Sequence, residues 1–589
     1  MPAVKAATFT AAATGNWSSG ATWGNSGNNV VGSGVPGASD SAVIVSGKTV
    51  TYDSSAPAIA GTVEVAGSMV VSKSGGTFGD FTIDSGGTFS FGGQVPVTFS
   101  GNFTNNGNMN ISSQGQTALT TYSGIGNVIA GNVTNQIANV TGTYTNIGML
   151  VTGVNATGTL NLEGSGTLVN LGTILYNCNK APTVTTLDCS APGNLFIWAG
   201  VNMSSTTPKA TAYYNLIIGN TGSAGFPLAG AGLSIANNLT VTNSGNITSW
   251  PANGAIGGTL SYFTTSTTAA ASFPTAFSVG GFVQTNGVLA MAANDVLTVT
   301  GTGAGTWTRT GGTFNQNSSS MVKFTGAAPV IGGTVTNNFA NLYIDSTAAN
   351  AIASTNLNVT NTLTIVAGAS LDVTAFNGGA MTMLNAESLL NGGMLVGNVT
   401  APSSAKIFAG LDGSYGTNII SGNLTMSSTN SSINLDVNSS ATAPNDLLMV
   451  GGALSLNNTP IKLKAPSAGA AIDTSADYTL VTAGSITGVP LLTWITAPAN
   501  ATNYSLVTSS TTMALHYVGA VISNPPTLAS SVNGNQMTFS WNTATYPGFF
   551  LQTSPTLAPG SWTPVPAGDT SPVLITIDPS TNAFFRLAQ

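Results

Sequence analysis

The feature that most constrains this chain is a short motif, Gly-Asn-(apolar)-Thr, which recurs between segments of alternating apolar and polar residues. The copies begin at Gly101, Gly131, Gly245, Gly397 and Gly422, with a variant beginning at Asn237. The first two copies are 30 residues apart and the last two are 25 apart, a spacing typical of solenoids and repeat arrays. A longer unit of two alternating segments joined by a small-residue turn also repeats, at 213–241 and 339–365.

The alternation predicts β-strands with apolar side chains inside and Thr, Ser and Asn outside. Gly and Asn tolerate the tight bends that corners between strands require, and stacked Asn side chains can form hydrogen-bonded ladders. The sequence therefore predicts an all-β fold: a β-solenoid (β-helix) rod with an N-terminal cap and a small C-terminal β-sandwich domain. At about 20–30 residues per coil, residues 60–520 would form on the order of 15–23 coils, or roughly 70–110 Å of rod.

Composition narrows the class of protein. Hydrophobic residues make up 42% of the chain and charged residues only 5%, which is the reverse of a disordered chain. The 11 Lys and Arg residues are too sparse to follow a phosphate backbone, so nucleic acid is not expected as a partner. No apolar run reaches the length of about 18 residues that a transmembrane helix needs.

Five parts are expected along the chain. Residues 1–59 would form the N-terminal cap, 60–403 the solenoid repeats, and 404–521 the final coils with longer loops. Residues 522–531 read as a Pro-containing linker, and 532–589 as the C-terminal β-sandwich-like domain. Trp541 and Trp562 are the expected core residues of that last domain.

Some segments resemble known families. GNLTM…LDVNSS…NDLLMVGGALSL…YTLVTAGSITG, within 422–488, resembles the autotransporter-associated β-strand repeat family of secreted bacterial surface proteins. GNWSSGATWGNSG near the N-terminus is similar to the opening of extracellular bacterial β-helix proteins, and FFLQTSPTLAPGSWTPVP to the small terminal β-sandwich that many of them carry. The resemblance implies export, a β-helical fold and a cell-surface location, and no particular ligand. The start Met1–Lys5 has no signal-peptide hydrophobic region, so we interpret a signal peptide as already removed.

The only two cysteines, Cys178 and Cys189, have ten residues between them, including Pro182. The polar flanks favour a surface loop or hairpin closed by a disulfide, which would add about 2–3 kcal/mol and indicate an oxidising compartment. The alternative is two free thiols. Zinc is not expected, because no further Cys or His lies nearby to complete a site.

Residues able to carry catalysis are few and scattered. They are the single His516, the two arginines Arg309 and Arg586, and the acid pairs Asp80/Asp84 and Asp473/Asp477, with Asp412 alone. Glycoside hydrolysis needs paired carboxyl groups, and lyase chemistry needs a base together with charge stabilisation. We therefore expect no enzyme activity, no catalytic residue, no cofactor and no metal, with a weak calcium site at Asp80 and Asp84 as the alternative to solvated turn carboxylates.

The expected function is that of a non-enzymatic extracellular structural protein that assembles with itself into a filament, sheath or surface layer through β-strand edges. The segment 4–17, with Val4, Phe9 and Trp17, is the candidate assembly strand; alternatively, it begins the first coil of its own chain. A second possibility is an adhesin that stacks glycans or other cell-surface components on Trp250, Trp307 and Trp494, unless these side chains fill the core. A carbohydrate-active enzyme is a third possibility.

Overall fold

The computed structural model describes the chain except residues 1–5, 25–33, 93–94, 96, 111–120, 123–127, 135–138, 141, 153–161, 179, 201–207, 211, 220–224, 229–232, 243–244, 252–253, 376–378, 412 and 520–525. The described residues are nearly all in strands and turns. They contain two short 3-10 helices, η1 (Gly20–Trp23) and η2 (Ala501–Asn503), and no α-helix. The all-β prediction is confirmed.

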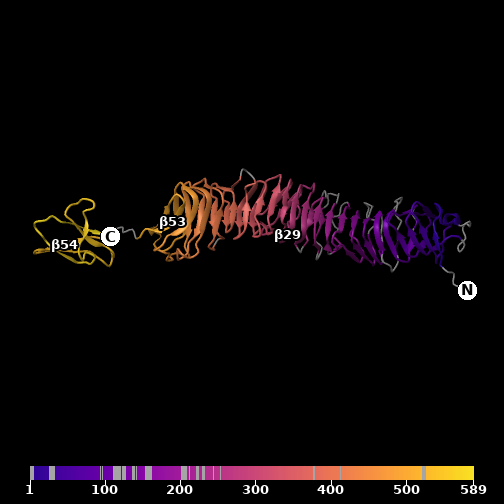
Figure 1. The fold of residues 1–589 in the computed structure, drawn as a ribbon, viewed down its shortest axis with the longest axis horizontal. Helices are drawn as coiled ribbons and strands as arrows, with labels where there is room; N and C mark the ends of the chain where they lie inside the picture. Colours follow the sequence, from indigo (N-terminus) through magenta and orange to yellow (C-terminus); the bar gives the residue numbers. More distant parts are fainter. Residues whose placement is uncertain are drawn as a thin grey trace. The chain divides into compact units, whose positions relative to one another are not determined.

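The chain divides into two compact units, residues 1–501 with 505–516, and 502–504 with 517–589. The first unit is a parallel β-solenoid (Figure 1). One coil illustrates its construction: β6 (Thr62–Val65), β7 (Ser68–Val71) and β8 (Gly76–Phe78) follow one another around the coil, and β9 (Phe81–Ile83) then pairs in parallel with β6. Each coil thus contributes strands to up to three parallel ladders.

The ladder that contains β6 and β9, here called ladder A, is continuous along the whole solenoid. It begins with β1 (Thr8–Thr10) and β3 (Ser41–Ile44) and ends with β47 (Ser432–Asp436), β49 (Thr459–Lys464) and β51 (Pro490–Thr496). Parallel pairings connect every step between them. At one step the connection is a single parallel bridge between Cys189 and Tyr213.

Two further ladders complete the coils. Ladder B includes β4 (Thr49–Tyr52), β7, β19 (Thr173–Tyr176), β29 (Ala276–Gln284), β32 (Gly303–Arg309), β35 (Pro329–Gly333), β45 (Thr417–Ile420), β48 (Leu447–Ser455) and β50 (Tyr478–Thr487). The third side, here called ladder C, consists of separate stretches: β5 (Ile59–Ala60) and β8 pair in one, and β43 (Asn398–Ala401) and β46 (Leu424–Met426) in another. Long strands such as β48 and β50 turn a corner and serve two ladders.

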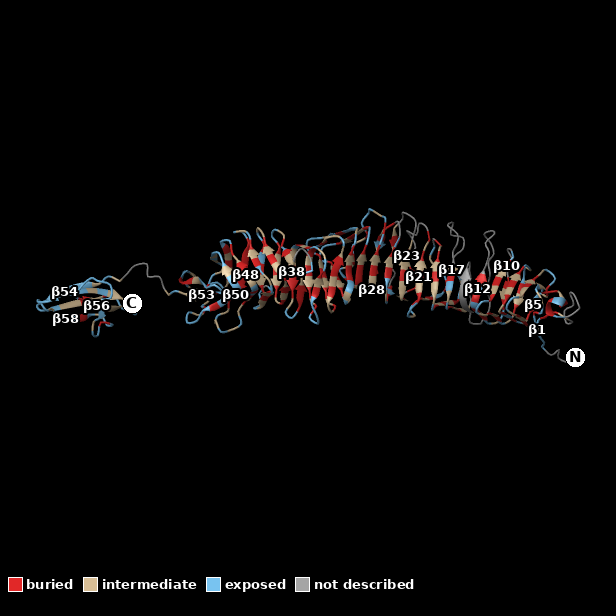
Figure 2. Cartoon of the chain, turned by 45° about the horizontal axis from the view of Figure 1, so that its top comes forward, coloured by how far each residue is buried: buried red, intermediate tan, exposed pale blue. Residues whose placement is uncertain are grey.

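Strict alternation fills the core. In β6, Val63 and Val65 are fully buried, whereas Thr62 and Glu64 face outward. Figure 2 shows buried residues along the strands throughout the stack. Asparagine side chains pair between successive coils: Asn146 Nδ2 donates to Asn170 Oδ1 at 2.8 Å, and Asn391 Nδ2 to Asn418 Oδ1 at 2.7 Å.

The boundaries expected at residues 59 and 403 fall within continuous strand ladders. Residues 6–24 and 34–59 form the first coils, because β1 pairs with β3, and β4 and β5 pair with later strands of ladders B and C. No break occurs at residue 404 either, since β44 (Lys406–Ala409) joins ladder A between β41 (Ser388–Asn391) and β47.

The second unit contains two three-stranded antiparallel sheets. One holds β54 (Ala529–Asn533), β55 (Gln536–Ser540) and β58 (Val573–Thr576); the other holds β56 (Phe550–Ser554), β57 (Thr563–Pro564) and β59 (Phe584–Ala588). Their core contains Phe539, Trp541, Leu551 and Val573. Trp562, also expected in this core, is only half-buried, with the Arg586 guanidinium 4.4 Å from its ring centroid. The first strand begins at Ala529, three residues before the expected boundary.

Candidate functional site

The N-terminal end of the solenoid is closed by aromatic side chains. Trp17 is fully buried, and its ring centroid lies 5.0 Å from Trp23 and 5.1 Å from Tyr52. Its indole N–H donates to the carbonyl of Pro36, and that of Trp23 donates to the carbonyl of Trp17. These bonds satisfy the polar atoms that buried indoles carry. The first coils are therefore sealed by an aromatic plug.

The candidate assembly strand lies partly in this plug. Phe9 is on β1, half-buried, with its ring 6.4 Å from that of Trp23. β1 pairs in parallel with β3, with Phe9 opposite Ala42, so this segment begins the first coil of its own chain. Trp17 belongs to the plug and offers no side chain to a neighbour, and Val4 lies outside the described residues. Of the two that the structure describes, Phe9 alone lies on an accessible strand.

The C-terminal end of ladder A differs from its interior. Within β49, the inward residues Ile461 and Leu463 are fully buried. Their register neighbours on β51, Leu492 and Trp494, are both partly exposed. Every residue of β51 is at least partly exposed. The inward side chains of the last parallel strand are therefore incompletely covered.

The outward face of β51 is unusually apolar. Leu491 is 47% exposed and Ile495 is 55% exposed, whereas the outward residues of β49 include Lys462 and Lys464. Ladder B ends in a different way, because β53 (Thr512–Tyr517) adds to β50 in the antiparallel direction and buries Met513 and Leu515. The C-terminal end thus combines a covered edge on ladder B with an apolar, partly uncovered strand on ladder A.

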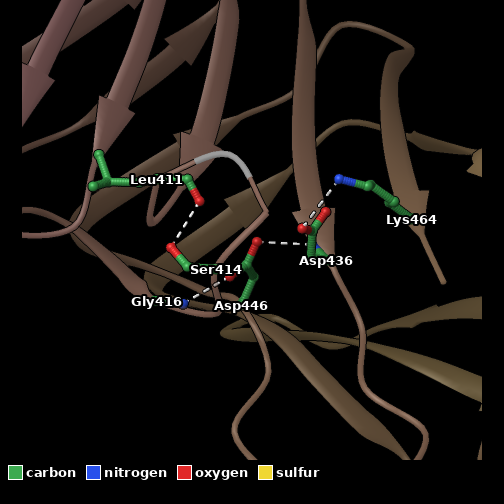
Figure 3. Close-up of polar contacts among 6 residues, drawn as sticks. All are labelled: Leu411, Ser414, Gly416, Asp436, Asp446 and Lys464. Carbon is green, nitrogen blue, oxygen red and sulfur yellow. Dashed lines mark hydrogen bonds and ion pairs between the residues drawn. The ribbon is translucent and has the colours of Figure 1, made fainter. Parts of the chain in front are cut away.

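A pocket with two carboxyl groups lies beside this end. It has a volume of about 250 Å³ and is lined by Phe408, Leu411, Asn434, Asp436, Asp446, Lys464 and Ile495 among others. Asp446 is almost fully buried; its Oδ1 accepts a hydrogen bond from the Gly416 N–H at 2.8 Å and its Oδ2 from the Asp436 N–H at 2.7 Å. Figure 3 shows Asp446 pointing between these two backbone groups, and Lys464 approaching the Asp436 carboxylate.

The electrostatics of this pocket follow from burial. Burial, and to a lesser extent the Asp436 carboxylate, raise the pKa of Asp446 to about 7 against the opposing effects of the two backbone N–H groups and Lys464. Lys464 Nζ lies 3.7 Å from Asp436 Oδ2. Because both oxygens of Asp446 already accept backbone N–H bonds, the geometry suits a clamp at the neck of the 437–445 loop better than a proton donor to a ligand. Neither acid was singled out from sequence, since only long-range folding joins 416, 436 and 446.

The structure joins two of the titratable residues singled out from sequence, His516 and Asp477. His516 Nδ1 lies 2.7 Å from Asp477 Oδ1, and both side chains are about half-exposed. Asp473 Oδ1 accepts bonds from the backbone and side chain of Ser475, and Asp80 Oδ1 accepts one from the Asn102 N–H. Asp412 lies outside the described residues. Across the described part of the chain, no group of three or more His, Cys, Asp or Glu residues is placed to hold a metal ion.

The two cysteines are buried free thiols, so the disulfide and the surface loop expected for them are wrong. Cys178 follows β19 and Cys189 follows β20 (Thr186–Asp188). Each cysteine lies two positions after a buried inward residue, Tyr176 for Cys178 and Leu187 for Cys189. Cys189 also makes the ladder A bridge to Tyr213. Each thiol therefore fills core space within its own strand run.

Two of the three tryptophans considered as glycan contacts under the adhesin alternative are core residues. Trp307 is fully buried, its ring stacked 4.1 Å from Phe282, and Trp250 is 4% exposed against Phe273. Trp494 alone is partly exposed, at the C-terminal end of ladder A.

Comparisons with known proteins identify no family. No protein-family model matches the chain, and no curated protein matches it. Among the described residues, no helix is long and apolar enough to span a bilayer.

Proposed function

We propose that this chain is a non-enzymatic extracellular structural protein whose solenoids assemble end to end into a filament, sheath or surface layer. The observation that carries the proposal is the continuity of ladder A. Its first strand, β1, and its last parallel strand, β51, run in the same direction on the same face of the solenoid. A second copy translated along the solenoid axis would bring its β1 beside β51 and extend the parallel ladder.

Such a contact has a physical driving force. Strand edges carry unpaired N–H and C=O groups that can pair with another chain. Stacking would also cover the inward Leu492 and Trp494 and place a neighbouring strand beside the outward Leu491 and Ile495, at about 25 cal/mol for each Å² of apolar surface removed from water. A head-to-tail contact of this kind does not close on itself, so it propagates into an open filament. The low content of charged residues, 5%, weakens the repulsion between copies.

The proposal that the protein is non-enzymatic is supported by the carboxyl pocket. Asp446 has both oxygens engaged by backbone N–H groups and is 3% exposed, whereas a general acid must reach the proton acceptor of its substrate. The adhesin alternative is weakened, since Trp250 and Trp307 offer no ring face to a sugar. A screen of common neutral and acidic polysaccharides is expected to show no product release.

Assembly can be tested with lysine at the apolar positions of β51. Wild-type protein is expected to form linear particles as concentration rises, followed by light scattering and negative-stain electron microscopy. Leu491→Lys/Ile495→Lys is expected to stay monomeric, because lysine on an edge strand opposes strand addition. The matched control is Thr82→Lys, on the outward face of β9, which is paired on both sides within ladder A and lies beside Glu64; this variant should assemble normally. Wild-type protein that stays monomeric throughout, or doubly substituted protein that assembles equally well, would contradict the proposal.

A further inference from the structure

Arg309 is a buried cation in the middle of the solenoid. It ends β32, and on ladder B it lies in register between Gln284 and Gly333. The residue is 5% exposed. A Cβ at Gly333 would come within 1.8 Å of the Arg309 carbonyl oxygen, and Gly333 has φ of +127°. A glycine is therefore required for the next coil to lie this close to Arg309.

The guanidinium group has only neutral partners within the described structure. Its Nε donates to Gln284 Oε1 at 2.9 Å, one terminal nitrogen to the Gly312 carbonyl at 3.1 Å, and the other to the Thr336 carbonyl at 3.5 Å. None of the ion pairs found among the described residues includes Arg309. Buried charges in proteins are ordinarily paired with an opposite charge. Three acceptors also leave part of the five-donor capacity of a guanidinium unused.

This uncompensated charge lines an open groove. The groove has a volume of about 470 Å³ and lies where two successive coils turn the corner after β32 and β35. Besides Arg309 it is lined by Phe314, Asn315, Thr336 and Asn338 among others. The Asn315 and Asn338 side chains are exposed, so amide donors and acceptors stand beside the cation. Neutral amides suit sugar hydroxyl groups, and a guanidinium suits a carboxylate.

We propose that this groove binds the carboxylate of an acidic saccharide, with Arg309 as the charged contact and Asn315 and Asn338 as partners for hydroxyl groups. The inference goes beyond the proposed function, because the groove lies in mid-solenoid, away from β1 and β51. Binding of this kind would attach an assembled solenoid to an acidic polysaccharide without any reaction of the sugar.

The test compares two sugars that differ in one group. Methyl β-D-glucuronide, methyl β-D-glucoside and acetate are titrated at constant ionic strength into full-length protein, below its assembly concentration, by calorimetry or ligand-observed NMR. The proposal expects binding of the glucuronide, with the glucoside and acetate each at least about tenfold weaker, a difference of about 1.4 kcal/mol. Acetate that binds as tightly as the glucuronide overturns the saccharide assignment, and glucoside that does so overturns the role of the carboxylate.

A variant separates the site from the fold. Asn315→Asp leaves the residues that hydrogen-bond Arg309 unchanged. Because it places a carboxylate of the protein in the same groove, it should weaken glucuronide binding at least about tenfold. The matched control Asn430→Asp adds the same charge at an exposed turn in a later coil and should bind like wild type. Circular dichroism verifies that both variants fold. No glucuronide binding to wild type, or equal binding to Asn315→Asp and wild type, refutes the proposal.

Discussion

Leu463 and Trp494 lie opposite each other on the last two parallel strands of ladder A, yet Leu463 is fully buried and Trp494 is partly exposed. The difference arises because each inward side chain of a solenoid is covered by the coils on both sides. Leu463 has such coils, whereas Trp494 belongs to the terminal strand. This pair marks where ladder A stops covering its own core.

The opposite end should depend on its aromatic plug. Trp17→Ala removes a fully buried indole and its contacts with Trp23 and Tyr52, and a buried Trp→Ala change costs about 3–5 kcal/mol. Because coils of a solenoid contact mainly their neighbours, we expect the loss to be local. Hydrogen exchange should accelerate in β3, β4 and β6 and stay unchanged in β47 and β49. The half-exposed Trp562→Ala serves as control and should leave the solenoid unaffected; uniform acceleration along the solenoid would contradict the plug.

Stability should fall as pH rises through neutrality. Burial raises the pKa of Glu387 from 4.5 to about 8 and that of Asp446 from 3.8 to about 7. Between the unfolded and folded pKa values the native state binds more protons than the unfolded state, so the free energy of unfolding decreases with pH in this window. At about 1.4 kcal/mol per pKa unit, the two groups together amount to several kcal/mol between about pH 4 and pH 8.

Glu387→Gln isolates the larger of the two contributions to the pH dependence of the free energy of unfolding. Glu387 is fully buried, and its Oε2 accepts the Leu384 N–H at 2.6 Å, a bond that the glutamine carbonyl can also accept. Urea unfolding at pH 5 and pH 8 should show a smaller loss of stability in this variant than in wild type. Glu163→Gln, at an exposed glutamate, should behave like wild type. Equal slopes for Glu387→Gln and wild type would show that the buried carboxyl group does not cause the pH dependence.

The thiols should be unreactive in the folded protein. Both are fully buried, and burial raises the pKa of Cys189 well above its ordinary range, which lowers the fraction of reactive thiolate. Titration with a thiol reagent should detect both groups in denaturant and neither quickly in buffer. Rapid labelling of native protein, or a Cys178–Cys189 bridge in non-reduced peptides, would contradict the buried arrangement.

Alternation along the strands was sufficient to predict the solenoid and its inward Val, Ile and Phe residues. The same rule, applied to Tyr176/Cys178 and Leu187/Cys189, places both thiols inward at i and i+2. The disulfide prediction failed because it weighed the polar flanks and short spacing above that alternation. The Asp446 clamp could not be predicted, since its two donors, Gly416 and Asp436, are set by the stacking of separate coils. From sequence, Arg309 was only one of a few scattered charged residues. Its burial without a carboxylate partner could not be predicted, because it depends on how the coils pack.

The central claim is that β51 of one copy pairs with β1 of the next. Hydrogen exchange by mass spectrometry, on assembled and monomeric protein under the same buffer conditions, tests this most directly. Peptides covering residues 490–496 and 8–10 should gain protection on assembly, because their edge N–H groups become paired, while mid-ladder peptides around β31 (Val296–Val299) should not change. Assemblies whose added protection lies elsewhere, such as in residues 529–588, or protein that never assembles, would contradict the account.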